Sequence, residues 1–181
     1  MHKTIAKLHK PIAKELAHIL MGVILFFACA KLYIPLKPVP ISLQSIAVML
    51  IALLYDKKTG MKIIASYITL GAMGVQVFAG HSAGFLYLFG PTGGYLIGYA
   101  AAICIMNIIK TKLGISSFSK ILLNCLAGTS VIFACGISWL AISMGLKEAL
   151  TVGLMPFIIP GMIKAIVLSA FLKGLRLIHK D

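Results

Sequence analysis

The chain has 181 residues, of which 60% are hydrophobic and 12% are charged, and its mean hydropathy is +1.03. A soluble domain usually carries about 25% charged residues, and one of this size could not cover so much apolar surface. The composition therefore excludes an ordinary water-soluble protein and predicts that lipid is part of the solvent. The net charge of +13 does not indicate a nucleic-acid partner, because the basic residues form short clusters between apolar runs rather than one patch.

Six apolar segments, in chain order, are long enough or nearly long enough to cross a bilayer. They lie at about 15–34, 42–55, 61–78, 94–109, 121–144 and 152–172. We therefore expect an all-α membrane bundle of six transmembrane helices that forms a single domain over 1–181. No small-residue cleavage site follows the basic segment at about 1–14, so the first span is expected to stay in the protein.

Lysine and arginine are distributed unequally between alternate loops. The alternate loops on one side hold only Lys31, Lys37 and Lys147, whereas thirteen basic residues fall on the other side. The thirteen are Lys3, Lys7, Lys10, Lys14, Lys57, Lys58, Lys62, Lys110, Lys112, Lys120, Lys173, Arg176 and Lys180. The positive-inside rule then predicts cytoplasmic N and C termini and a multi-pass protein of a bacterial cell membrane.

Two irregular segments interrupt the helical pattern. Three prolines at 35–40 forbid a continuous helix and predict an extended connection. The loop between the third and fourth helices, GHSAGFLYLFGPTGG at 80–94, is rich in glycine and carries no Lys, Arg, Asp or Glu. Irregular backbone at membrane depth is tolerated where it lines a cavity, so this loop is the first candidate for a binding site. A plain turn facing solvent is the alternative, but it would be expected to carry charges.

Polar and aromatic side chains in this loop suit a flat, mostly apolar ligand with a few polar groups. The candidates are His81, Ser82, Tyr87, Thr92 and Tyr95. An interfacial aromatic belt is the rival explanation for the tyrosines. A metal site is not expected, because His81 has no second histidine or carboxylate near it in the sequence.

Lys164 is the strongest single indication of a functional site in the sequence. It follows Pro156 by eight residues, or about 12 Å along a helix, and so lies below the outer surface of the membrane. The only acid in the predicted spans is Glu15, at the very start of the first one, so Lys164 has no internal carboxylate to neutralise it and a bound anion could supply the opposite charge. Snorkelling of the side chain to the membrane surface and a neutral amine are the two alternatives.

Ser42 and Gln44 stand at the outer end of the short second segment, where a helix N-terminus offers free N–H groups. Gln44 could hydrogen-bond a ligand there, while Ser42 is equally explained as an N-cap.

Several motifs are missing from the sequence. There is no phosphate-binding loop, no paired carboxylates and no nucleophile–histidine–acid set, so we expect no ATP hydrolysis, no catalytic residues and no enzyme. The four cysteines lie in apolar stretches and read as small hydrophobic residues, so neither a metal nor a cofactor is expected. A transporter of this kind would need its energy from partner subunits.

Four motifs occur in the order and at the spacing of the BioY family: KPVPISLQSIAV at 37–48, GAMGVQVFAG at 71–80, GPTGGYLIGY at 90–99 and PFIIPGMIKA at 156–165. The chain resembles this family of biotin-binding membrane subunits, the S components of energy-coupling-factor (ECF) transporters, from about Ile34 to Lys173. The resemblance implies high-affinity capture of biotin near the outer face of a six-helix bundle. It also implies three partners, a transmembrane coupling (T) subunit and two cytoplasmic ATPases, which alone would use ATP.

The resemblance assigns Lys164 to the family's lysine in the biotin site. Gly161, however, stands where members commonly carry an acid, and Gly80 stands where members can carry Asn. One alternative is that backbone groups and Gln44, His81 or Ser82 take over the role of these two side chains. The other is that the ligand is not the family's or that its affinity is reduced. A stand-alone secondary transporter or channel for a small organic anion remains the alternative function. An intramembrane enzyme is the other rival.

Overall fold

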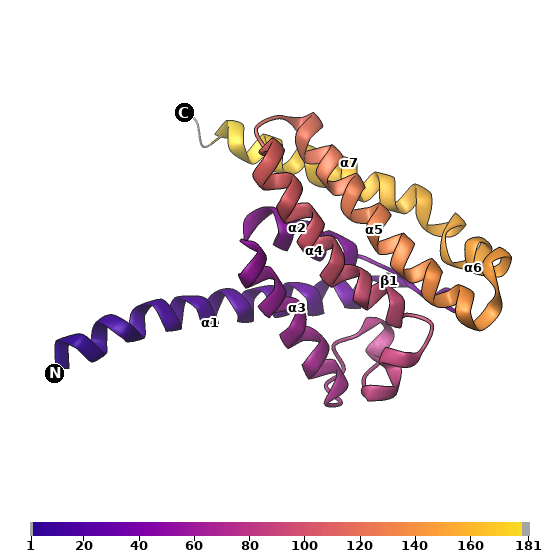
Figure 1. Cartoon of the computed structure of the whole chain (residues 1–181), viewed down its shortest axis with the longest axis horizontal. Helices are drawn as coiled ribbons and strands as arrows, with labels where there is room; N and C mark the ends of the chain where they lie inside the picture. The colour runs from indigo at the N-terminus through magenta and orange to yellow at the C-terminus, as the bar shows by residue number, and fades with distance from the viewer. Residues whose placement is uncertain (1, 179–181) are drawn as a thin grey trace.

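We describe a computed structural model of residues 2–178, with side chains for residues 13–175. Seven α-helices follow one another in these residues: α1 (His2–Lys31), α2 (Gln44–Leu54), α3 (Lys57–Ala72), α4 (Gly93–Leu113), α5 (Phe118–Met144), α6 (Leu146–Gly153) and α7 (Met155–Ile178). Short 3-10 turns, η1 (Ala79–His81) and η2 (Phe85–Phe89), occupy the loop between α3 and α4 (Figure 1). The all-α prediction is confirmed.

Four helices within the described residues are long and apolar enough to cross a membrane: Ala13–Lys31 in α1, α4, α5, and Met155–Leu175 in α7. The other two segments predicted as spans form shorter helices, because α2 has 11 residues and α3 has 16. Asp56 separates them, since its carboxylate caps α3 by accepting from the backbone N–H groups of Lys58 and Thr59 at 2.9 and 3.2 Å. The loop predicted between the last two spans, which holds Lys147, contains the short helix α6.

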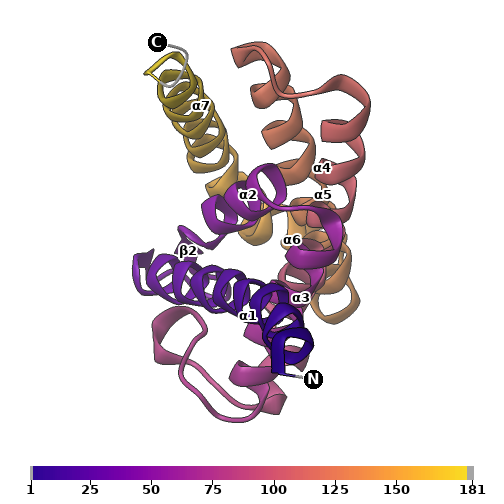
Figure 2. The same cartoon turned by 90° about the vertical axis from the view of Figure 1, so that its left-hand side faces the viewer.

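The proline-rich connection between α1 and α2 is extended, as predicted, and it also forms a small antiparallel hairpin. Strand β1 (Tyr33–Ile34) pairs with β2 (Ile41–Ser42), and Tyr33 lies opposite Ser42. The backbone N–H of Leu43 then donates to the carbonyls of Cys29 and Leu32 near the end of α1. These bonds fix the start of α2 beside α1. In Figure 2, β2 and α2 lie between α1 and the diverging helix α7.

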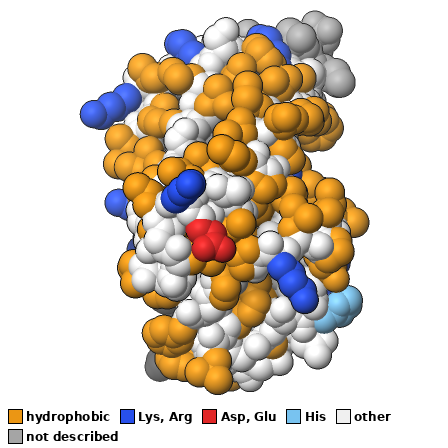
Figure 3. Space-filling model, turned by 90° about the vertical axis from the view of Figure 1, so that its right-hand side faces the viewer, with side chains coloured by type: hydrophobic (Ala, Val, Ile, Leu, Met, Phe, Trp, Pro, Cys, Tyr) orange, Lys and Arg blue, Asp and Glu red, His pale blue; other side chains and the backbone are white. Residues whose placement is uncertain are grey.

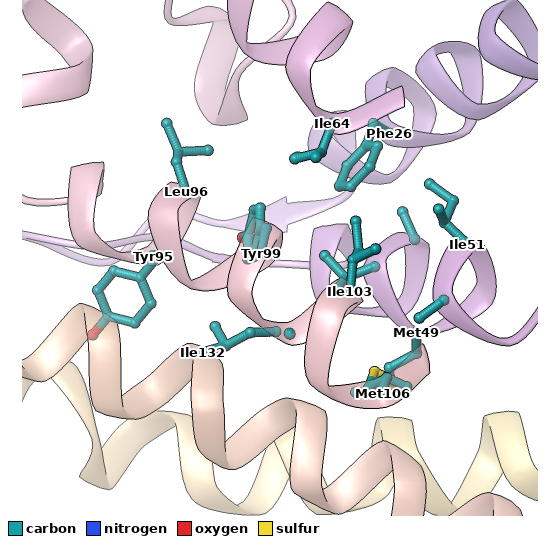
Figure 4. Close-up of a cluster of buried hydrophobic side chains, with 14 of the residues drawn as sticks. Phe26, Met49, Ile51, Ile64, Tyr95, Leu96, Tyr99, Ile103, Met106 and Ile132 are labelled. Carbon is teal, nitrogen blue, oxygen red and sulfur yellow. The ribbon is translucent and has the colours of Figure 1, made fainter. Parts of the chain in front are cut away.

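Buried side chains from all seven helices form one hydrophobic core. Tyr99, Ile103 and Met106 follow one face of α4 at helical spacing, with Phe26 of α1 and Met49 of α2 nearby (Figure 4). Figure 3 shows a face of the molecule on which hydrophobic side chains predominate and charged ones are isolated. Large hydrophobic side chains are also exposed along the lengths of α1 and α7, and such a surface is expected where lipid rather than water surrounds the protein.

Aromatic rings connect this core to the irregular loop. Phe26 stacks on Tyr67 with ring centroids 4.7 Å apart, and Tyr67 meets the edge of Phe78 at 5.6 Å. Phe78 in turn stacks on Tyr87 of η2 at 4.7 Å. A β-carbon at Gly71 would lie 2.1 Å from the Phe78 ring, so only glycine leaves room for this ring against α3. The loop is therefore packed onto the bundle.

Candidate binding site

A cavity lies where α2, α4, α5 and α7 meet beneath the proline-rich connection and the loop between α3 and α4. We call it the inner cavity. Its walls are mostly apolar, with hydroxyl groups, one amide and one amine among them. They are formed by Val39, Pro40, Ser42, Gln44, Ser45, Ala79, Tyr87, Thr92, Tyr95, Leu96, Tyr99, Thr129, Ile132, Phe133, Phe157, Gly161 and Lys164.

Lys164 extends from α7 to the start of α2. Its half-buried amine donates to the backbone carbonyl of Ser42 at 2.6 Å and to the Ser45 hydroxyl at 3.3 Å. Both partners are neutral, and the ion pair present in the described residues joins Lys62 to Glu15 elsewhere. The amine is therefore held at the inner cavity by two neutral groups, with no carboxylate of the described residues beside it. This position contradicts snorkelling to the surface. Because a helix N-terminus is its positive end, this is an electrostatically poor place for a cation.

Gln44 lies at the first position of α2 and is 5% exposed. Its carboxamide nitrogen donates to the Tyr67 hydroxyl at 2.6 Å, and its oxygen accepts from the Ser42 hydroxyl at 2.8 Å. The Tyr67 hydroxyl in turn donates to the backbone carbonyl of Val77 at 2.9 Å. Gln44 thus joins the hairpin, α2, α3 and the outer loop through one polar network. The Gln44 backbone N–H also donates to Ser42 Oγ at 3.4 Å, but Leu43 is the N-cap of α2 and none of the described side chains caps it, so the N-cap role predicted for Ser42 is wrong.

Close packing at two glycines holds the GPTGGY segment in place. A β-carbon at Gly93 would lie 1.9 Å from the Leu88 carbonyl oxygen, and one at Gly94 would lie 2.2 Å from Cβ of Trp139. The Trp139 indole N–H also donates to the Gly90 carbonyl at 3.1 Å. The start of α4 therefore sits directly against α5 and η2, which places the loop over the inner cavity.

Tyr95 contributes its ring to the inner cavity and points towards α5 in Figure 4. Its hydroxyl donates to the backbone carbonyl of Gly153 at 2.7 Å, where α6 ends. The ring centroid lies 6.1 Å from that of Phe157 on α7. Tyr95 therefore offers a ligand an aromatic surface, while its hydroxyl joins α4 to α6.

The site residues predicted from the sequence are divided between two hollows and the exposed surface. Lys164, Gln44 and Tyr95 line the inner cavity. Gly80 and Ser82 instead line a second hollow above it, the outer depression, between the proline-rich connection and the loop. The two hollows share four residues, Pro40, Ala79, Tyr87 and Thr92.

His81 is exposed and lines neither hollow. Gly80 and His81 both have positive φ, at 68° and 63°, and the chain turns sharply there. No group of three or more His, Cys, Asp or Glu suited to a metal occurs in the described part of the chain.

The structure adds Ser45 and Thr129 as polar side chains of the inner cavity that the sequence did not single out. Ser45 lies one turn from the proline-rich connection, and only its bond to Lys164 distinguishes it from an ordinary helical serine. Thr129 is in the middle of a long apolar helix, and its hydroxyl bonds to the Cys125 carbonyl at 2.9 Å. A neutral residue in an apolar span gives little signal without a known neighbour.

A family model matches this chain over residues 1–180, and it describes the BioY family. The chain belongs to the BioY family. A biotin transporter BioY of Thermotoga maritima is 39% identical over 149 residues, which cover 82% of this chain and 86% of that protein. A probable biotin transporter BioY of Rickettsia prowazekii is 34% identical over 165 residues, covering 90% and 84% of the two chains.

The solved structure of an S component for biotin from an ECF-type ABC transporter matches the fold. Its TM-score is 0.80, with 26% sequence identity and 92% of each chain covered. BioY membership makes this chain a multi-pass membrane protein of a transporter family and confirms that it is not an enzyme. Gly161, the position without the family's acid, lines the inner cavity, and a β-carbon there would lie 3.2 Å from Thr129 Cγ2.

Proposed function

We propose that this BioY chain is the substrate-binding subunit of an ECF-type ABC transporter and captures biotin from outside the cell with high affinity. The observation that carries the proposal is the amine of Lys164, which lines the inner cavity and has only neutral hydrogen-bond partners among the described residues. The likeness to a solved S component for biotin over 92% of both chains supports biotin as the ligand.

In the proposed complex, the biotin carboxylate accepts from Lys164 in place of the Ser42 carbonyl. The new bond is charge-assisted, whereas the present one is made to a neutral oxygen. A carboxylate there would also face the N-terminal end of α2, where a negative charge is favoured and the lysine alone is not. The bicyclic ring would pack on the aromatic walls of the cavity, which include Tyr87, Tyr99 and Phe157.

We propose six crossings of a bacterial cell membrane, with both termini in the cytoplasm. The unequal distribution of lysine and arginine supports this orientation. The start of α1 and the end of α7 lie at the left of Figure 1, whereas α6 lies at the right-hand end. The helices α2 and α3, about 16 and 24 Å long, would cross as short spans beside longer neighbours.

The proposed partners are a transmembrane coupling (T) subunit and two cytoplasmic ATPases. The sequence has no phosphate-binding loop, and neither a cofactor nor a resident metal is expected. ATP would then act only through the partners. Vesicles containing this chain alone should bind biotin but not accumulate it, whereas accumulation would favour the stand-alone transporter.

The decisive experiment measures binding of radiolabelled biotin to the purified chain and to Lys164→Met, which removes the charge but keeps a long apolar side chain. We expect Kd to rise by roughly ten- to a hundredfold, because a charge-assisted bond contributes about 1.5–3 kcal/mol. Lys147→Met is the matched control, since Lys147 is exposed on α6 and lines none of the hollows described above. Equal affinity of Lys164→Met and the wild type would remove the lysine from the site.

A further inference from the structure

Thr92 has a buried hydroxyl group that makes no hydrogen bond of regular geometry within the described part of the chain. Its oxygen is inaccessible to solvent and has no partner of ordinary geometry among the described residues. The Tyr87 hydroxyl is a hydrogen-bonding neighbour of this group, but their contact does not have regular hydrogen-bond geometry. A buried hydroxyl without a partner costs about 1–3 kcal/mol, and a ligand group that bonded to it would recover this cost.

The position of Thr92 makes the missing bond more informative. Thr92 is the N-cap of α4, where a threonine hydroxyl normally accepts from a backbone N–H in the first helical turn. Here the residue has helical dihedral angles, φ −86° and ψ −9°, and makes no capping bond. The tight contacts of Gly93 and Gly94 hold this backbone in place. Thr92 thus does without its usual structural role and lines the inner cavity instead.

Thr92 and Lys164 both line the inner cavity, but each also lines a different neighbouring hollow. Thr92 also lines the outer depression, together with Tyr87. Lys164 does not line the outer depression. It lines an apolar groove beside β2 and α7 instead, and Thr92 does not line that groove. The cavity between them is walled mainly by apolar and aromatic side chains. This arrangement suits a ligand with an anionic group at one end, an apolar body and a neutral polar group at the other end.

We propose that the Thr92 hydroxyl is a specificity-determining group that hydrogen-bonds the ureido ring of biotin while Lys164 holds the carboxylate. The inference rests on the proposed function, because it takes biotin as the ligand. A hydroxyl can donate to the ureido carbonyl or accept from a ureido N–H, so it matches this group in either direction. It would also replace part of the recognition that the glycines at 80 and 161 do not supply.

The test is a binding cycle with three ligands: biotin, biotinamide, and a pentanoic acid on a tetrahydrothiophene ring, which keeps the carboxylate but lacks the ureido group. For biotin and biotinamide, Thr92→Val should raise Kd roughly three- to tenfold. For the ureido-free acid, Thr92→Val and the wild type should agree within about twofold. Lys164→Met should show the opposite pattern, with its penalty kept for the acid and lost for biotinamide.

Two variants guard against misfolding. Thr92→Ser keeps the hydroxyl and should bind biotin within about threefold of the wild type. Thr151→Val removes an exposed hydroxyl that bonds to the Lys147 carbonyl on α6 and should not change binding. Unchanged biotin affinity of Thr92→Val, or an equal penalty for the ureido-free acid, would overturn the role of Thr92. If the wild type fails to bind biotin, the proposed function itself is wrong.

Discussion

The contact between α4 and α5 and the attachment of α2 show two different ways of holding helices together. Along α4 and α5, a β-carbon at Gly94, Gly98, Gly128 or Gly136 would meet atoms of the facing helix at 2.2–3.0 Å. Small residues allow this close approach, and packing within a membrane depends on it. The short helix α2, in contrast, is joined to its neighbours by lysines at both of its ends.

The two lysines that contact the ends of α2 differ in their electrostatic surroundings. Lys110 of α4 donates to the carbonyls of Ala52 and Tyr55 at 2.7 and 2.5 Å, at the C-terminal end of α2, where a cation is favoured. Lys164 of α7 contacts the N-terminal end, where a cation is disfavoured. The comparison indicates that Lys110 has a structural role, whereas Lys164 is ready to exchange its neutral partner for an anion.

The largest effect is expected where the α4–α5 contact is broken. Gly94→Val would place Cβ about 2.2 Å from Trp139 Cβ and 2.8 Å from the Cys135 carbonyl oxygen. We expect a destabilisation of about 3 kcal/mol or more, at the upper end for overpacking, because backbone rather than a flexible side chain blocks the space. Thermal unfolding in detergent measures it, and biotin binding should weaken as the loop at 90–92 moves.

Gly174→Ala is the matched control for this substitution. Gly174 also lies within a helix, but no atom stands within 4 Å of its β-carbon position. Alanine is favoured over glycine in a helix by about 0.8–1 kcal/mol, so Gly174→Ala should raise the melting temperature slightly. Equal behaviour of the two variants would show that the α4–α5 contact is not specified by its glycines.

Removing Lys110, the lysine of α4 that contacts the C-terminal end of α2, should have an intermediate effect on stability. Lys110→Met removes the amine that holds the last carbonyls of α2, and we expect a loss of about 1–2 kcal/mol in stability. Lys112→Met, in the same turn but exposed, should lose less than about 0.5 kcal/mol. Chemical unfolding measures both.

If the two lysines have different roles, one substitution should reduce stability and the other should reduce biotin affinity. Lys110→Met should keep Kd for biotin within about threefold, because Lys110 does not line the inner cavity. Lys164→Met should instead lose affinity with little change in stability. A loss of binding by Lys110→Met as large as that by Lys164→Met would mean that both lysines act by holding α2.

Local signals in the sequence predicted the helical bundle and the extended proline-rich connection, and they singled out Lys164, which lines the inner cavity. Hydropathy and proline act over short stretches, so a single chain reveals them. The partners of Lys164 were not predictable, because Ser42 and Ser45 lie about 120 residues away along the chain. The pairing of β1 with β2 was missed as well, since two-residue strands have no recognisable pattern.

The outer loop shows where proximity in sequence misleads. His81 and Ser82 are neighbours, yet Ser82 lines the outer depression and His81 does not. The positive φ angles at Gly80 and His81 redirect the chain within two residues, and a histidine gives no sequence signal for that conformation. Residue identity therefore located the loop, but its backbone geometry decides which side chains face the cavity.

The smallest effect concerns Asp56, which begins α3 directly after the end of α2. Hydrogen bonds from the Thr59 side chain and from the backbone of Lys58 and Thr59 hold the pKa of Asp56 below its usual range. A lowered folded-state pKa contributes stability that is fully present above the unfolded value, about 3.9, and is lost as the pH falls through the folded value.

Asp56→Ala should therefore cost about 0.5–1 kcal/mol at pH 7, and this difference from the wild type should shrink towards pH 3. Asp56→Asn keeps an oxygen that accepts the capping bonds but cannot titrate, so its difference from Asp56→Ala should stay constant with pH. Melting temperatures of the three proteins between pH 7 and pH 3 provide the comparison. A wild-type advantage over Asp56→Ala that does not change with pH would mean that the carboxylate's charge has no part in the cap, and that α3, like the α4–α5 contact, is fixed by geometry alone.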